Sequence, residues 1–343
     1  QPALEGLGWI LEEADEVDRL IAVHRADLAG VEDPRARAQR LYRIASLLER
    51  HERDAEAMEV HQEALSAWAT FQPSLSALER LFTRHERWAE LLQLYDGELE
   101  GDPDQDRALH VLETMASIWY HQLQQPENAI EAYRRILGRN PDHVPTLRAM
   151  ARLCAETARW HDLVELNERE LSHISDPRRS VELLQRTGEV WEHRLLNLDQ
   201  AMECYRRVLQ HDPRFLPALK ALGRLYRQKG RWSELIEMHQ AEIRATDDTE
   251  QVLSLLYDVA EIYEEELIDE IRAASTYREV LRLRPGHLPA VTALERILRN
   301  HGDWQGLVEL MQGNLDRLSD SRDKALLLWS MGALRESQLA DTA

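Results

Sequence analysis

Apolar and polar residues follow one another along most of the chain with the spacing of amphipathic α-helices. Between Arg159 and Gly230, for example, apolar residues recur at steps of three and four, so that they form one face of each predicted helix. The pattern is interrupted where turn chemistry is expected, at Asp176, Asp212 and Gly230. The sequence therefore predicts helices of ordinary length, arranged in pairs and joined by short turns.

The helix pattern repeats at a fixed interval, which is most visible in the tryptophans Trp88, Trp160, Trp232 and Trp304. The columns of proline, alanine and arginine with the same interval are Pro73, Pro145, Pro217 and Pro289; Ala77, Ala149, Ala221 and Ala293; and Arg80, Arg152, Arg224 and Arg296. Such a period is typical of a repeat solenoid, in which stacked copies share a continuous core. Each repeat holds two helix pairs, so the sequence predicts an all-α solenoid.

We expect a single repeat array over residues 1–343. The predicted helix pairs are about 2–30, 35–68, 73–101, 105–140, 144–173, 177–212, 216–246, 249–284 and 288–317, followed by a half pair at 321–343. The first and last repeats are incomplete, whereas solenoid ends normally carry polar capping repeats. We therefore expect either a piece of a longer array or self-association through the uncapped ends.

One segment of each repeat has small, aromatic, alanine, aromatic and proline residues in a fixed order. The three sets are Ala116, Trp119, Ala129, Tyr133 and Pro141; Gly188, Trp191, Ala201, Tyr205 and Pro213; and Ala260, Tyr263, Ala273, Tyr277 and Pro285. This order resembles the tetratricopeptide repeat, with one extra residue in the interhelical loop. The alternate segment is more divergent. The resemblance covers essentially the whole chain, and it implies a right-handed superhelix of antiparallel helix pairs that serves in protein interactions.

In this family the first helix of each pair lines a concave groove, which implies a place for two columns of residues. The groove-facing arginines are Arg80, Arg152, Arg224 and Arg296, and the residues at the equivalent place of the intervening first helices are Ser46, Ser117, Glu189 and Glu261. One interpretation is a ladder of salt bridges that sets the stacking angle between repeats. The other is a row of paired charges that holds an extended peptide or a helix. The sequence leaves both interpretations open.

A strongly acidic stretch lies between Asp247 and Glu270, where ten residues are acidic and none is Lys or Arg. An acidic groove floor would attract a basic segment and speed its association, although a charge run is usually a solvated face. Four residues of this stretch share one helical face, and Glu189 and Glu192 occupy matching positions one repeat earlier. With the arginines, the candidate partner-binding residues are Arg152, Glu189, Glu192, Arg224, Arg227, Tyr257, Glu261, Glu264, Glu265 and Arg296.

The chain is acidic overall, with 42 basic residues, 62 acidic residues and a formal net charge of −20. This surplus repels a polyanion at long range, which argues against nucleic acid or an anionic membrane as the main partner. No apolar run is long enough to span a bilayer and no secretory signal is visible, so we expect a cytoplasmic protein without membrane insertion. Because the chain opens with Gln1 and not with methionine, a removed targeting segment stays open.

No pattern in the sequence is typical of catalysis, of a cofactor or of a metal site. Cys154 and Cys204 form neither a metal-type cluster nor a disulfide framework, and each fits a buried helical position. The segments that begin at His51 and His85 lack the second histidine of the HExxH zinc motif. Glycine-rich phosphate loops and nucleophile motifs are also absent from the sequence. We therefore predict no enzyme activity, no catalytic residue, no cofactor and no metal.

The function that these observations favour is a protein–protein interaction scaffold, which binds a peptide or helix of a partner in its concave groove. The bound segment is expected to be basic. An alternative is that the chain is the substrate- or partner-recruiting arm of a larger multidomain enzyme. RNA binding by helical repeats is a third possibility, against which the negative charge and the lack of a base-reading column both weigh.

Overall fold

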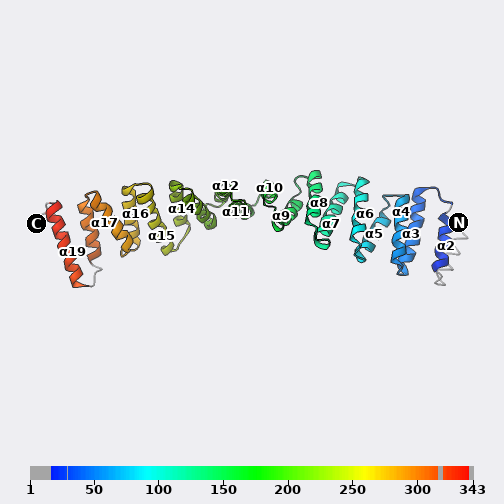
Figure 1. The fold of residues 1–343 in the computed structure, drawn as a ribbon, viewed down its shortest axis with the longest axis horizontal. Helices are drawn as coiled ribbons and strands as arrows, with labels where there is room; N and C mark the ends of the chain where they lie inside the picture. The colour runs from blue at the N-terminus through cyan, green and yellow to red at the C-terminus, as the bar shows by residue number, and fades with distance from the viewer. Residues whose placement is uncertain (1–16, 29, 316–319, 340–343) are drawn as a thin grey trace. The chain divides into compact units, whose positions relative to one another are not determined.

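A computed structural model of the chain describes residues 17–28, 30–315 and 320–339, and every regular element in these ranges is a helix (Figure 1). The first helix of the predicted pair 2–30 and the last residues of the half pair 321–343 lie outside the described residues. The chain divides into two compact units, residues 1–159 and residues 160–343. The helices are described below within each unit.

The first unit contains eight α-helices and one π-helical segment among its described residues. They are α2 (Val17–Leu28), α3 (Pro34–Arg50), α4 (Asp54–Ala67), α5 (Gln72–Arg84), α6 (Trp88–Glu100), α7 (Gln105–Ser117), η1 (Ile118–Gln122), α8 (Pro126–Arg139) and α9 (Val144–Glu156). The elements described in the second unit are α10 (Trp160–Leu171), α11 (Pro177–His193), α12 (Leu198–His211), α13 (Leu216–Gln228), α14 (Trp232–Ala245), α15 (Thr249–Glu261), η2 (Ile262–Glu266), α16 (Glu270–Leu283), α17 (Leu288–Asn300), α18 (Trp304–Leu315), α19 (Ser321–Leu334) and η3 (Arg335–Leu339).

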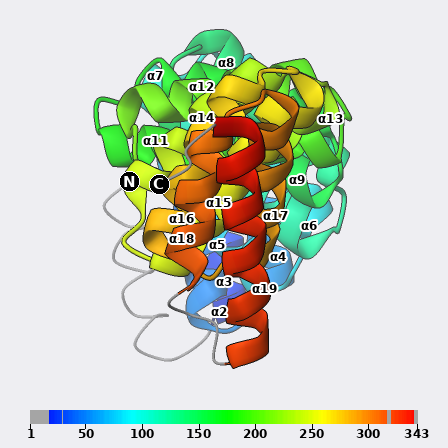
Figure 2. The same ribbon diagram turned by 90° about the vertical axis from the view of Figure 1, so that its left-hand side faces the viewer.

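Within each unit a helix packs mainly on the helices before and after it in the sequence. In the second unit α11 packs on α12, α12 on α13 and α13 on α14, and Figure 2 shows the same succession for α16 to α19. This neighbour-only packing is the arrangement of a solenoid, because each hairpin buries its apolar face against the adjacent hairpins. The predicted all-α fold of stacked antiparallel helix pairs is therefore confirmed.

Short polar side chains define where many of the first helices begin. Asp33, Asp104, Asp176 and Asp248 each stand at an N-cap and accept a hydrogen bond from a backbone N–H of the first turn. Such a bond satisfies one of the free donors that every helix start exposes. The recurring prolines lie in the first turn of α5, α9, α13 and α17, where a missing N–H costs nothing.

The tryptophan column marks the start of the second helix in alternate pairs, α6, α10, α14 and α18. These side chains are half-buried, and Trp88, Trp232 and Trp304 pack against the hydrophobic core of their units. Before the last two, the chain turns through Gly230 and Gly302, whose φ angles are 65° and 67°. Glycine adopts this left-handed conformation without the steric penalty of a side chain.

The sequence placed one extra residue in the interhelical loop, but in the structure it lies in the last turn of the first helix. There the backbone N–H groups of Leu123, Leu195 and Leu267 donate to the carbonyl five residues earlier, at distances of 3.1, 3.0 and 3.1 Å. This spacing is the hydrogen-bond pattern of a π-helix, which accommodates one more residue than an α-helical turn. The extra residue therefore widens the helix end, and the sequence did not predict its position there.

Part of the core of the second unit is formed where an aromatic ring of α12 meets a small residue of α11. Tyr205 is 1% exposed and lies against Gly188, where an added Cβ would stand only 2.6 Å from the ring carbon Cε1 of Tyr205. Ala201, on the same helix as Tyr205, is completely buried. This close approach orients the tyrosine hydroxyl toward the end of α11, where the candidate charged residues are found.

Candidate partner-binding surface

A buried glutamate links three helices of the second unit. The hydroxyl of Tyr205 on α12 donates to Oε2 of Glu192 at 2.9 Å, and the guanidinium of Arg224 on α13 donates to Oε1 at 2.6 Å. The Glu192 side chain is 7% exposed, whereas that of Arg224 is 58% exposed. Burial and the hydrogen bond to Glu192 raise the pKa of Tyr205, so its hydroxyl keeps its proton and remains a donor.

The same tyrosine–glutamate–arginine arrangement recurs one repeat later. Tyr277 on α16 donates to Oε2 of Glu264 at 2.9 Å, and the guanidinium of Arg296 on α17 binds Oε1 of the same carboxylate. Glu264 lies in the π-helical segment η2 and is 10% exposed. The second copy therefore reproduces both the burial and the hydrogen bonding of the first.

The first unit contains a variant of this arrangement with histidine in the tyrosine position. Nε2 of His61 on α4 lies 3.0 Å from Oε1 of Glu49 at the end of α3, and Arg80 on α5 binds Oε2 of Glu49. His61 is completely buried, and its Nδ1 lies 3.1 Å from the hydroxyl of Ser74. The three copies together are named here the aromatic–glutamate–arginine triads.

These triads show what four of the predicted groove residues do within the chain. Glu192, Glu264, Arg224 and Arg296 belong to ion pairs between successive first helices. Arg227 is likewise paired with Asp258, at 3.4 Å. Of the two interpretations left open by the sequence, the contacts of these residues fit the salt-bridge ladder. Binding of a partner by the same residues stays a prediction.

Arg152 differs from the other members of its column. It lies on α9 in the first unit, it is exposed, and it forms no ion pair with any described residue. Tyr120 stands where the other copies have Glu192 and Glu264, and its hydroxyl donates to Glu156. The arginine column therefore has one member without a carboxylate partner within the described part of the chain.

The remaining candidates, Glu189, Tyr257, Glu261 and Glu265, form the acidic part of the second unit. Glu189 and Glu265 are exposed, and Glu189 accepts a hydrogen bond of 3.0 Å from the amide of Gln185. Tyr257 and Glu261 are half-buried. Burial is the main cause that raises the pKa of Tyr257 to about 12, and the hydrogen bond with Glu261 is the second cause. The Tyr257 ring also packs on the rings of Tyr277 and His287, with centroids 5.8 and 5.1 Å away.

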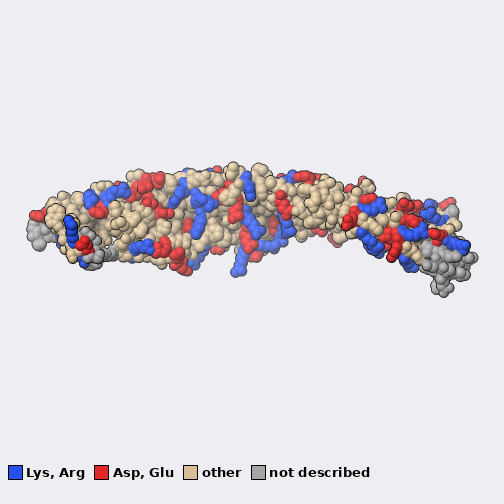
Figure 3. All heavy atoms as spheres, turned by 60° about the horizontal axis from the view of Figure 1, so that its bottom comes forward, with Lys and Arg blue, Asp and Glu red and all other residues tan. Residues whose placement is uncertain are grey.

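Five of the ten acidic residues between Asp247 and Glu270 are held by basic side chains within the unit. Glu250, Asp258, Glu264, Asp269 and Glu270 form ion pairs with basic side chains of the same unit. Figure 3 shows the same mixing on the displayed face, where acidic and basic side chains lie interspersed. Within the described residues Glu261, Glu265 and, one repeat earlier, Glu189 have no basic partner. The three glutamates, with Tyr257, are named here the acidic face.

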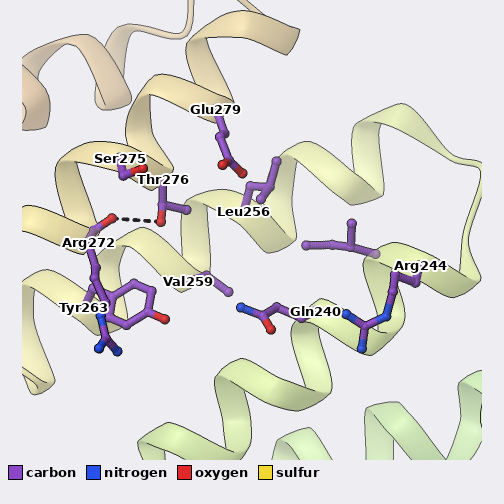
Figure 4. A pocket seen from close by; sticks show the side chains of 10 residues that line it. Gln240, Arg244, Leu256, Val259, Tyr263, Arg272, Ser275, Thr276 and Glu279 are labelled. Atoms are coloured by element: carbon purple, nitrogen blue, oxygen red, sulfur yellow. Dashed lines mark hydrogen bonds between the residues drawn. The ribbon is translucent and has the colours of Figure 1, made fainter.

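An open pocket is lined by residues of α14, α15, η2 and α16 (Figure 4). Leu256 and Val259 line it, and a rotation of about 100° per residue places these two side chains away from Tyr257 and Glu261. Tyr263 and Arg272 close one end, with the Arg272 guanidinium 5.7 Å from the tyrosine ring centroid. The volume of this pocket is about 320 Å³. Apolar and polar side chains alternate around it without a nucleophile–base pair among its described lining residues.

The described residues contain no group of three or more His, Cys, Asp or Glu placed to hold a metal ion. Cys154 and Cys204 form no disulfide and are buried, as the sequence predicted, and burial raises the pKa of the Cys204 thiol to about 11. No helix in residues 17–28, 30–315 and 320–339 combines the length and the apolar character needed to cross a membrane.

Family models described as tetratricopeptide repeat match three stretches of the chain, residues 74–108, 117–143 and 218–253. The first and third stretches fall on the divergent segments and contain Trp88 and Trp232 of the tryptophan column. The second stretch contains Trp119, Tyr133 and Pro141 of the resemblance described above. No curated protein matches the chain.

Several solved structures are similar to the chain at low sequence identity. Naa15/Naa10 bound to HypK-THB is 13% identical, with a TM-score of 0.43, over 97% of this chain and 55% of that chain. YrrB, described as a TPR protein with an unusual peptide-binding site, is 15% identical, with a TM-score of 0.32, over 54% of this chain and 91% of that chain. The P58(IPK) TPR domain is 12% identical, with a TM-score of 0.28, over 98% of each chain. The chain thus spans about half the length of the first of these structures.

Proposed function

We propose that this chain, which carries tetratricopeptide repeats, is a non-catalytic scaffold that holds a segment of a protein partner. Proteins built from this repeat are generally non-catalytic scaffolds. Stacked helix pairs suit this task, because they present an extended row of first helices to a partner. Cys154 and Cys204 are buried and form no disulfide, which is compatible with a reducing, cytoplasmic location.

The acidic face of the second unit is the proposed contact surface, and its preferred occupant is a basic segment. The observation that carries this proposal is the lack of a basic partner for Glu189, Glu261 and Glu265 within the described residues. The neighbouring Asp258 and Glu264 are paired with arginines. Carboxylates that have no internal cation keep their charge available, which speeds the association of a positively charged partner.

Tyr257 adds an aromatic surface to these charges. Its ring is held by contacts with Tyr277 and His287, so little conformational freedom is lost when a partner packs on it. Tyrosine is enriched at binding surfaces because it combines apolar area with a hydrogen-bonding hydroxyl. A lysine or arginine of the partner would find both a carboxylate and an aromatic ring here.

The triads have a supporting role in this proposal. Glu192 and Arg224 hold α11 to α13, and Glu264 and Arg296 hold η2 to α17, so the first helices that carry the acidic face keep a fixed spacing. Arg227, paired with Asp258, acts in the same way between α13 and α15. The exposed sides of these arginines border the acidic face, and a partner could also contact them.

A peptide selection on the full chain tests this proposal. Random sixteen-residue peptides displayed on phage are panned on the wild-type chain, and the selected sequences are expected to be enriched in Lys and Arg. The best peptide should bind about tenfold or more weakly to the triple variant Glu189→Gln, Glu261→Gln, Glu265→Gln, because three attractive charges are lost. Fluorescence anisotropy at physiological salt measures both affinities.

Another column of exposed glutamates provides a matched control. Glu165, Glu237 and Glu309 lie on the second helices α10, α14 and α18, again at the interval of one repeat. Replacing all three by Gln removes the same charge from a different surface, and binding should change by less than about twofold. Equal losses in both triple variants, or selected peptides without a basic bias, would contradict the proposed contact surface.

A further inference from the structure

The triads provide an internal standard with which the copy in residues 105–156 can be compared. In each of the three complete triads one glutamate carboxylate makes two contacts. One oxygen is within hydrogen-bond distance of an aromatic side chain, a tyrosine or a histidine, on the second helix of the same pair. The other oxygen binds the arginine on the first helix of the following pair. The copy in residues 105–156 has Tyr133 and Arg152 at the two outer positions, but Tyr120 in place of the glutamate. This copy therefore keeps both groups that bind a carboxylate and lacks the carboxylate.

The local contacts leave these two groups available. Arg152 is exposed and has no ion pair with a described residue, although it lies near enough to Tyr120 and Tyr133 to act electrostatically on both. Tyr133 is half-buried, whereas Tyr205 and Tyr277 are each 1% exposed, and its hydroxyl forms no hydrogen bond with a described residue. Burial raises the pKa of Tyr133, so the hydroxyl remains protonated and able to donate.

The neighbouring acidic residues do not fill the site. Glu156 lies one turn after Arg152 on α9 but accepts the hydroxyl proton of Tyr120. Glu113 on α7 acts electrostatically on Tyr133 and forms no hydrogen bond with it. Neither carboxylate forms an ion pair with Arg152 among the described residues.

We propose that Arg152 and Tyr133 bind a carboxylate supplied by a segment of a protein partner, which takes the position that Glu192 and Glu264 occupy in the complete triads. One carboxylate oxygen accepts from the Tyr133 hydroxyl and the other from the Arg152 guanidinium. The complete triad gives the geometry that the ligand would adopt, with donor–acceptor distances of 2.9 Å for Tyr205 and 2.6 Å for Arg224.

The composition of the site favours a carboxylate over a phosphate group. A single guanidinium and one hydroxyl match the two oxygens of a singly charged, planar carboxylate. A phosphate monoester carries almost two charges, and Glu113 and Glu156 nearby would repel it more strongly. The site lies in the first unit, so it is independent of the acidic face proposed above, and a failure of one proposal leaves the other standing.

Small carboxylates test the site directly in the full chain. Nε–Hε signals of ¹⁵N-labelled arginine are followed by NMR during titration with N-acetyl-glutamate amide, whose side chain carries its only carboxylate. The expected result is a saturable shift of the Arg152 signal, with no comparable shift for Arg80, Arg224 or Arg296, which already hold a carboxylate. N-acetyl-glutamine, whose only carboxylate is terminal, distinguishes a chain terminus from a side chain as the natural source. N-acetyl-glutamine amide has no carboxylate and should cause no shift.

A variant that supplies its own carboxylate is the sharpest control. Tyr120→Glu restores the glutamate of the complete triads, so an internal carboxylate should compete, and the added ligand should bind about fivefold or more weakly, the equivalent of one exposed ion pair. Tyr133→Phe removes the second donor and should also weaken the binding. Unchanged circular dichroism checks that both variants fold. Equal shifts at all four arginines, no saturation, or undiminished binding to Tyr120→Glu would overturn the proposal.

Discussion

Glu192 shows how a charged side chain can be buried in an array of this kind. Desolvating a carboxylate costs several kcal/mol unless its oxygens are paired and hydrogen-bonded. Here one oxygen accepts from Tyr205 and the other from Arg224, and the exposed arginine carries the charge of the pair out to solvent. The same two contacts, with a tyrosine and an arginine, recur at Glu264 one repeat later. The arrangement is therefore a feature of the repeat and not of a single position.

Loss of the tyrosine hydroxyl should therefore destabilise the second unit. Tyr205→Phe leaves a buried carboxylate with one unsatisfied oxygen, and we expect the free energy of unfolding to fall by about 1–3 kcal/mol. Urea denaturation of the full chain measures the change. Tyr263→Phe is a matched control, because the Tyr263 hydroxyl forms no hydrogen bond with a described residue, and its effect should stay within about 0.5 kcal/mol. Equal effects of the two substitutions would contradict this account of the triads.

His61 gives the triad of the first unit a sensitivity to acid that the tyrosine copies lack. Burial lowers the pKa of His61 below its ordinary value of 6.5, against the opposing hydrogen bond with Glu49. A lowered pKa means that the folded state favours the neutral imidazole. The resulting stability is fully present above about pH 6.5, and it is lost as the pH falls through the lower pKa of the folded state.

We therefore expect wild-type stability to fall more steeply between pH 7 and pH 5 than that of His61→Tyr, which introduces the residue of the other copies. Urea denaturation at pH 7 and at pH 5 measures the change in the free energy of unfolding for each protein. A change in stability that is the same at both pH values does not affect this comparison. Parallel slopes would show that His61 does not titrate with folding.

The ion pairs of the arginine column differ by three residues from the alignment that the repeat period gives. By repeat position the sequence aligns the arginines with Ser46, Ser117, Glu189 and Glu261 on the intervening first helices. In the structure Arg224 and Arg296 reach Glu192 and Glu264, three residues further along. Glu49, which binds Arg80 in the structure, likewise lies three residues after Ser46 and was not among the candidates. The direction of the side chains at a helix end decides which carboxylate an arginine binds. The repeat period of the sequence does not specify this direction.

At the scale of the helix, the π-helical turn decides where these side chains stand. Glu264 lies inside η2 and Tyr120 inside η1, so both follow the extra residue that widens the end of the helix. The sequence contained this extra residue as a departure from the usual repeat length. The sequence could not show whether the extra residue lies in the loop or in the helix. Either placement preserves the apolar pattern of the residues before and after it.

The crossing of α11 and α12 provides a test of helix packing. Gly188→Ala places a methyl carbon about 2.6 Å from the Tyr205 ring, and we expect the free energy of unfolding to fall by about 1–3 kcal/mol. The sequence alone predicts tolerance, since Ala116 and Ala260 occupy the equivalent positions. Gly97→Ala is the control, because nothing lies near its added carbon and alanine favours helix. Thermal unfolding compares the two, and a neutral Gly188→Ala would show that α11 and α12 can move apart without cost.

At the scale of the whole molecule, periodicity predicted the fold and left the binding surface open. The fixed interval of the repeat and the three- and four-residue steps together require helix pairs that bury their faces against neighbours, and the structure has this arrangement in each unit. The net charge of −20 did not show where charge is available, because half of the ten acidic residues between Asp247 and Glu270 form ion pairs within their unit. The side-chain contacts add that Glu189, Glu261 and Glu265, already candidates from the sequence, have no basic partner among the described residues.

Photo-crosslinking tests most directly whether the acidic face is the surface that holds a partner. A benzophenone amino acid replaces Ser254, an exposed residue two helical turns before Glu261 on the same face of α15, or Glu237 on α14 as the control position. The account predicts that a selected basic peptide crosslinks to position 254 and that unlabelled peptide abolishes this product. Crosslinking at position 237 alone, or equally at both positions, would contradict it.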